Sequence, residues 1–189
     1  MNNQIRVLGF AGSLRKKSYN KSLLKAAVEL APKNIELQTF DLEGIPLYNQ
    51  DLEMSLPAKV RELKAKIRGA DAVLIAAPEY NYSVPGVLKN AIDWASRPYG
   101  DNVFEDKPVA LMSASVGMLG GARAQYHLRQ TFVFLNAHPL NTPEVMMPYA
   151  QDRIDENGEI KDETTRKLIR ELLKALVLWT QRLRKETDR

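Results

Sequence analysis

One stretch near the N-terminus decides the fold: it reads LGFAGSLRKKSYN and covers residues 8–20. Its apolar first part is followed by glycine, hydroxyl, guanidinium and amide groups, and the pattern beyond Asn20 becomes helical. This order predicts a buried strand over residues 5–10, a polar loop and a helix N-terminus. Free backbone N–H groups at a helix start, with hydroxyls and an arginine beside them, favour the binding of one phosphate.

The rest of the chain repeats this alternation of strand and helix. The run Ala72–Ala77 is apolar throughout, which is typical of a parallel strand covered on both faces. Strands are expected over 5–10, 35–40, 72–77 and 109–112, with an irregular fifth within 139–147, and helices over 20–31, 57–69, 85–97, 122–134 and 164–184. We predict loops over 41–55 and 151–163.

Five alternations of strand and helix indicate an α/β protein. Right-handed crossovers then give a parallel sheet between two helix layers. Residues 1–189 contain no internal repeat and no linker, so we expect a single domain.

Three unusual loops follow the first, third and fourth predicted strands. We name them loop one (residues 12–20), loop two (residues 78–82) and loop three (residues 113–121). Because ligands bind at the carboxyl ends of parallel strands, these loops are expected to meet at one sheet edge and form one site.

Each loop has a ligand-binding and a structural interpretation. Loop one offers Ser13, Arg15, Ser18 and Asn20 to a phosphate, or it is an ordinary helix cap with a solvated basic segment. Loop two is stiffened by proline and carries tyrosines that suit a planar heterocycle, or it closes the sheet end. The glycines of loop three admit a flat ligand, or they serve positive φ angles.

Composition narrows the function classes. The net charge is +4, but the basic residues do not interleave with aromatic ones, so nucleic acid is not an expected partner. No stretch approaches the roughly 18 apolar residues of a membrane span. Cysteine is absent and no secretory signal is apparent, which favours the cytoplasm. His127 and His138 are too isolated to predict a metal site.

A catalytic side chain is not evident either. Glu79 is the one acid expected at the site, and Ser13 and Ser115 lack a paired histidine and aspartate. Arg123 and Tyr126, on the helix after loop three, fit a ligand or an interface. A site for something flat and phosphorylated, without a catalyst, indicates a cofactor that carries the chemistry.

The motifs resemble those of a known family. Residues 12–20 (GSLRKKSYN) are similar to its G-S-x-R-x-x-S-x-N phosphate loop, residues 78–81 (PEYN) to its isoalloxazine loop, and loop three to its third loop. The family is the NAD(P)H-dependent FMN reductases of flavodoxin-like fold, which include quinone, chromate and azo-dye reductases.

The resemblance implies a five-stranded sheet of order 2-1-3-4-5 in a three-layer sandwich. It also implies an enzyme that holds FMN non-covalently and passes hydride from NADPH or NADH through it to a small acceptor. Such acceptors are quinones, or others such as chromate, azo compounds or free flavin. It also implies a homodimer or homotetramer. No catalytic side chain is expected. The FMN-binding residues that it implies are Ser13, Arg15, Ser18, Tyr19, Asn20, Pro78, Glu79, Tyr80, Asn81, Tyr82, Ser115 and Gly117.

Two other functions are compatible with this site. One is a flavodoxin-type electron carrier, although such carriers are strongly acidic and this chain is basic. The other is a non-enzymatic FMN-binding redox or regulatory module. Within the enzyme interpretation, the electron acceptor and the choice between NADPH and NADH stay open, with a slight preference for NADPH.

Overall fold

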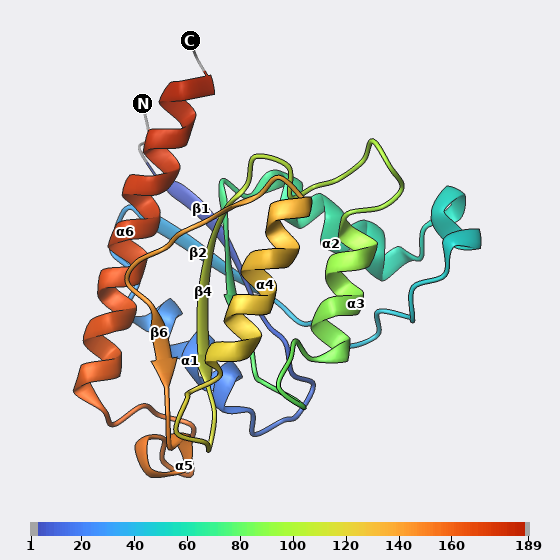
Figure 1. Cartoon of the computed structure of the whole chain (residues 1–189). Coiled ribbons are helices and arrows are strands. Elements are labelled where there is room, and N and C mark those ends of the chain that lie inside the picture. Colours follow the sequence, from blue (N-terminus) through green and yellow to red (C-terminus); the bar gives the residue numbers. More distant parts are fainter. Residues whose placement is uncertain (1–3, 188–189) are drawn as a thin grey trace.

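The computed structural model describes residues 4–187 and contains a parallel sheet with helices on both faces (Figure 1). The strand order is β2-β1-β3-β4-β5, and β6 also pairs with β4. The strands are β1 (Ile5–Ala11), β2 (Ile35–Phe40), β3 (Ala72–Ala76), β4 (Pro108–Ala114), β5 (His138–Pro139) and β6 (Val145–Met147). The helices are α1 (Tyr19–Glu29), the 3-10 helix η1 (Gln50–Ser55), α2 (Ala58–Gly69), α3 (Gly86–Ala95), α4 (Ala122–Phe134), α5 (Ala150–Arg153) and α6 (Glu163–Thr187).

The expected strand order and parallel pairing are confirmed. Strand β1 lies between β2 and β3, with Val7 opposite Ala72 and Ala11 opposite Ala76. All five residues of β3 are buried, as the apolar run at this position predicts. Because β1, β3 and β4 run in the same direction, the loops that follow them leave the sheet at one edge.

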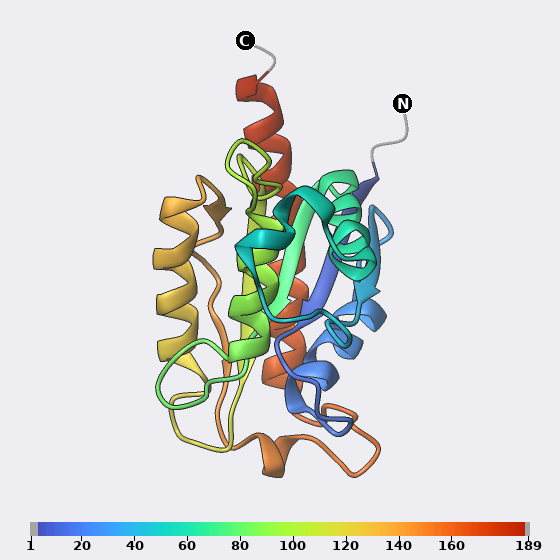
Figure 2. The same ribbon diagram turned by 90° about the vertical axis from the view of Figure 1, so that its right-hand side faces the viewer.

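Each face of the sheet has its own hydrophobic core. Side chains of α1 and α6, such as Leu23 and Leu172, pack on one face with Val7 and Leu74. Helices α2, α3 and α4 pack on the opposite face, so that in Figure 2 α2 and α3 stand in front of the sheet and α6 behind it. The alternating strand residues therefore serve two cores.

The structure differs from the sequence expectations in its less regular segments. The fifth strand is divided into β5 and β6, which pair with opposite ends of β4. The predicted loop over 41–55 ends in η1, and the predicted loop over 151–163 contains the end of α5 and an antiparallel bridge between Ile154 and Ile160. Residues 1–3 and 188–189 of the expected domain lie outside the described residues.

Asp71 connects the two ends of the described chain. Its carboxylate accepts the backbone N–H of Arg6 at 2.8 Å and pairs with the guanidinium groups of Arg6 at 3.3 Å and Arg184 at 2.6 Å. Burial raises the pKa of the Asp71 carboxyl, but these hydrogen bonds and charges outweigh burial and hold that pKa below its ordinary value. Strand β1, the start of β3 and the end of α6 are thereby held together.

No helix within residues 4–187 has the length and apolar character needed to cross a membrane.

We predict that Asp71→Asn lowers the free energy of unfolding at pH 7 by about 1 kcal/mol, because the amide keeps the geometry but loses the charge that both arginines contact. The folded-state pKa lies below the unfolded value of about 3.9. The charge therefore stabilises the fold above that value, and its contribution is lost as the pH falls through the folded-state pKa.

Urea denaturation at pH 7 and near pH 3 measures this difference. The control is Asp93→Asn, which removes only an exposed pair with Lys89 on α3 and should change stability by less than about 0.5 kcal/mol. Equal effects of the two substitutions, or an Asp71→Asn effect that grows at low pH, would contradict the assignment.

Candidate functional site

Loop one joins β1 to α1 and presents free hydrogen-bond donors. Ser18 caps the helix, and its hydroxyl accepts the N–H of Lys21 at 3.4 Å. Ser13 is buried, and its hydroxyl accepts the N–H of Arg15 at 3.3 Å. The first turn of α1 has no acidic residue, and within residues 4–187 the N–H groups of Tyr19 and Asn20 form no hydrogen bond. This helix start can therefore receive an anion.

Asn20 binds the main chain of β4. Its side chain is 2 % exposed. The amide donates to the carbonyl oxygen of Ala114 at 3.0 Å and accepts the N–H of the same residue at 3.0 Å. Asn20 thus fixes the start of α1 to the end of β4, so that loops one and three keep a constant separation.

Loop two is a tight turn anchored at Glu79. The main chains of Tyr80 and Ser83 exchange two hydrogen bonds, and Asn81 and Tyr82 have positive φ angles of 49° and 66°. Such angles are uncommon outside glycine, so the surrounding contacts must hold this turn in place.

The Glu79 carboxylate provides such a contact, because it caps α4. It accepts the N–H of Arg123 at 3.0 Å and that of Ala124 at 3.4 Å, and it pairs with the Arg123 guanidinium at 2.8 Å. Gly121 precedes the helix and has no side chain to act as cap. The negative charge suits a helix N-terminus, and the contact joins loop two to the end of loop three.

Loop three needs its last two glycines. Gly120 and Gly121 have φ angles of 59° and 90°, and a Cβ atom at Gly120 would lie 2.7 Å from the main-chain carbon of Met146. Gly117 differs, because a Cβ there would meet only the Ser115 hydroxyl at 3.7 Å. Loop three is therefore pressed against β6 at one end and open at Gly117.

The three loops line one cavity of about 420 Å³. The sequence expectation that they meet at one edge of the sheet is thus confirmed. The cavity is lined by Arg15, Ser18, Tyr19, Asn20, Pro78, Glu79, Tyr80, Ala114, Ser115 and Val116. We call it the central cleft. A smaller cavity of about 250 Å³ shares Glu79 and Ser115 with it and reaches Gly117, Gly121 and Arg123.

Four of the expected binding residues do not line the central cleft. Ser13 is buried within loop one, Asn81 and Tyr82 are exposed at the outer end of loop two, and Gly117 lines only the smaller cavity. The guanidinium of Arg123 lies 3.7 Å from the centre of the Tyr82 ring, so Arg123 touches loop two as well as Glu79.

Ala114 and Val116 were not singled out from the sequence, although both line the cleft. Both are next to Ser115 in the sequence, and this position could have indicated that they line the cleft. Tyr126 is 51 % exposed on α4 and lines neither cavity.

Residues 5–152 match the family model described as NADPH-dependent FMN reductase. An NAD(P)H-dependent FMN reductase of Pseudomonas aeruginosa is 52 % identical over 185 residues, which cover 97 % of this chain and all of the relative. A quinone reductase of Escherichia coli is 45 % identical, with coverage of 87 % and 89 %. Among solved structures, FerB, a flavoenzyme NAD(P)H:(acceptor) oxidoreductase of Paracoccus denitrificans, aligns with a TM-score of 0.86 and 37 % identity over 94 % of this chain and 98 % of its own.

We predict that Asn20→Ala lowers the free energy of unfolding by about 2 kcal/mol, because it leaves the buried N–H and carbonyl of Ala114 without partners. Thermal and urea unfolding measure the loss. Asn34→Ala is the matched control, since Asn34 is exposed and its side chain forms no hydrogen bond within residues 4–187. A loss for Asn20→Ala no larger than for this control would show that the contact with β4 does not stabilise the site.

Proposed function

The chain belongs to the NADPH-dependent FMN reductase family, and from this membership we propose that it is an FMN-dependent oxidoreductase that transfers hydride from NAD(P)H to quinones or other small electron acceptors. The observation that carries the proposal is the convergence of the three loops on one cleft. Loop one offers donors for a phosphate, and loops two and three leave room for a planar ring.

The residues present fit FMN. The N–H groups at the start of α1 and the Arg15 guanidinium, which meets no carboxylate within residues 4–187, suit a phosphate dianion. Pro78 and the stiff turn after it, with Ser115 and Val116 opposite, suit a flat heterocycle. We assign the phosphate to Ser13, Arg15, Ser18, Tyr19 and Asn20. We assign the ring system to Pro78, Glu79, Tyr80, Asn81, Tyr82, Ser115 and Gly117.

Bound FMN supplies the hydride and electron transfer, so the chain needs no catalytic acid or base of its own. Its residues position the reactants. Asn20 and Glu79 hold the three loops at fixed separations, and the N–H groups of Asn81 and Tyr82, which form no hydrogen bond within residues 4–187, are available to the polar edge of a ring. Positioning of this kind provides most of the protein's contribution to such a reaction.

The proposal includes a homodimer or homotetramer in the cytoplasm, formed by a single domain over residues 1–189. Large apolar side chains are exposed on loop three and α4, including Met118 at 71 %, Val133 at 79 % and Phe134 at 73 %, and such a surface favours burial against another copy. The cytoplasm is where NAD(P)H is available as reductant. Light scattering coupled to gel filtration measures the mass of the assembly.

We predict that the purified, FMN-loaded protein oxidises NADPH in the presence of a benzoquinone over many turnovers. The loss of NADPH absorbance reports the rate. Repeating the assay with NADH in place of NADPH, and with chromate in place of the quinone, ranks the reductants and the acceptors. The control omits the quinone. A protein that holds FMN but neither bleaches with NADPH nor turns over would contradict the enzyme proposal and favour the binding module.

We predict that Arg15→Ala weakens FMN binding by roughly tenfold or more, because a charge-assisted contact to the phosphate is lost. Arg15→Lys keeps the charge without the two-pronged geometry, so its loss should be intermediate. Flavin fluorescence during titration of the apoprotein measures both affinities. Unchanged FMN affinity in Arg15→Ala would refute the phosphate assignment.

A further inference from the structure

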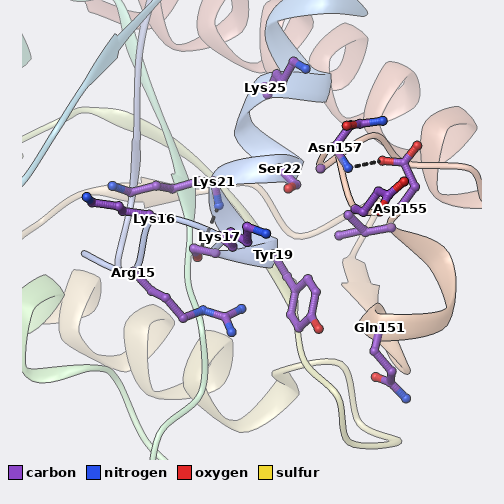
Figure 3. A pocket seen from close by; sticks show the side chains of 14 residues that line it. Arg15, Lys16, Lys17, Tyr19, Lys21, Ser22, Lys25, Gln151, Asp155 and Asn157 are labelled. Atoms are coloured by element: carbon purple, nitrogen blue, oxygen red, sulfur yellow. Dashed lines mark hydrogen bonds between the residues drawn. The ribbon is translucent and has the colours of Figure 1, made fainter.

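A second cavity, of about 690 Å³, adjoins the central cleft at Arg15, Ser18 and Tyr19 (Figure 3). It lies between the start of α1 and the segment that follows β6, and we call it the outer pocket. Its remaining lining residues are Lys16, Lys17, Lys21, Ser22, Lys25, Gln151, Ile154, Asp155, Glu156, Asn157 and Gly158. Of all the residues that line this pocket, only Arg15, Ser18 and Tyr19 are also assigned to FMN.

The wall formed by loop one and α1 carries an excess of positive charge. Lys21 is paired with Asp41 at 3.0 Å and Lys25 with Glu159 at 2.8 Å. Arg15, Lys16 and Lys17 meet no carboxylate within residues 4–187. Because Arg15 is assigned to the FMN phosphate, Lys17 is the cation on the Tyr19 side of loop one that is available to a second anionic ligand.

Of the two acids on the opposite wall, Asp155 offsets little of this charge. The Asp155 carboxylate accepts the N–H groups of Glu159 and Asn157 at 2.8 and 3.0 Å and pairs with Lys161 at 3.0 Å. These contacts lower the pKa of Asp155, and the hydrogen bond from the Glu159 N–H has the largest effect. The Asp155 carboxylate is therefore occupied by groups of its own turn. Glu156 is exposed on the same turn.

The side chains around the outer pocket suit a phosphorylated nucleoside. The Arg15 guanidinium lies 4.9 Å from the centre of the Tyr19 ring, and Figure 3 shows Arg15 and Lys17 on the Tyr19 side of loop one. Lys16 extends to the other side in the same view. Across the pocket stand the amides of Gln151 and Asn157, groups that can bond the edge of a base or a ribose.

We propose that the outer pocket binds the adenosine 2′-phosphate half of NADPH, with Lys17 as a residue that favours NADPH over NADH. This inference rests on the proposed function, because it assumes a nicotinamide in the central cleft. The two cavities share Arg15, Ser18 and Tyr19, so the outer pocket is the space into which a dinucleotide in the central cleft would extend. A basic residue such as Lys17 accommodates a 2′-phosphate.

The test uses the FMN-loaded protein and two probes, 2′,5′-ADP and 5′-AMP, titrated by calorimetry. Both probes are adenosine with one 5′-phosphate, so the difference in their affinities reports the 2′-phosphate alone. We expect 2′,5′-ADP to bind at least tenfold more tightly than 5′-AMP, and Lys17→Gln to remove about tenfold of its affinity. The control is Lys33→Gln, which makes the same charge change at an exposed lysine outside the pocket and should leave both affinities unchanged.

Three outcomes would overturn the inference. These are equal binding of the two probes, equal losses in Lys17→Gln and Lys33→Gln, and release of FMN by 2′,5′-ADP, which would show that the probe occupies the flavin phosphate position. Binding is measured without turnover, so the two proposals fail separately. Quinone reduction without selective probe binding contradicts only this inference, and selective binding without turnover contradicts only the proposed function.

Discussion

The paired hydrogen bonds between the Asn20 amide and the main chain of Ala114 are the contact on which the geometry of the site depends. A parallel sheet brings its loops to one edge, but it does not set the distance between loops that leave different strands. Asn20 sets it for loops one and three. Glu79 does the same for loop two and α4 by capping a helix that begins after a glycine. One buried and one partly buried polar contact thus brace three loops.

In the proposed function FMN carries the chemistry, and this bracing holds the cleft that would position it. The Glu79 carboxylate makes charge-assisted contacts with main-chain N–H groups, which are stronger than neutral hydrogen bonds and hold loop two against α4. Other loop positions are constrained by size or by charge alone. Gly120 must be small because the β6 main chain lies against it, and the donors of α1 must stay free of acidic neighbours. These constraints agree with the proposal that the protein positions the reactants.

Much of this was predictable from the sequence, because the decisive patterns are local. The apolar run before Gly12 and the wholly apolar run Ala72–Ala77 indicated buried strands, and the convergence of the loops followed from parallel strands alone. The contacts that brace the site were not predictable, since Asn20 and Ala114 are 94 positions apart and Glu79 and Arg123 are 44 apart. The division of the fifth strand into β5 and β6 was not predictable either. It depends on which residues of β4 are free to pair with it, and a local sequence pattern does not show this.

The meeting of Arg6 and Arg184 at Asp71 has a consequence for the connectivity of the chain. The start of β1 and the end of α6 lie at the same end of the molecule, opposite the edge where loops one to three gather (Figure 1). The three loops and the Asp71 contacts therefore lie at opposite edges of the sheet. A circular permutant that joins the end of α6 to the start of β1, with new ends opened in the exposed segment before η1, would keep every contact of the three loops.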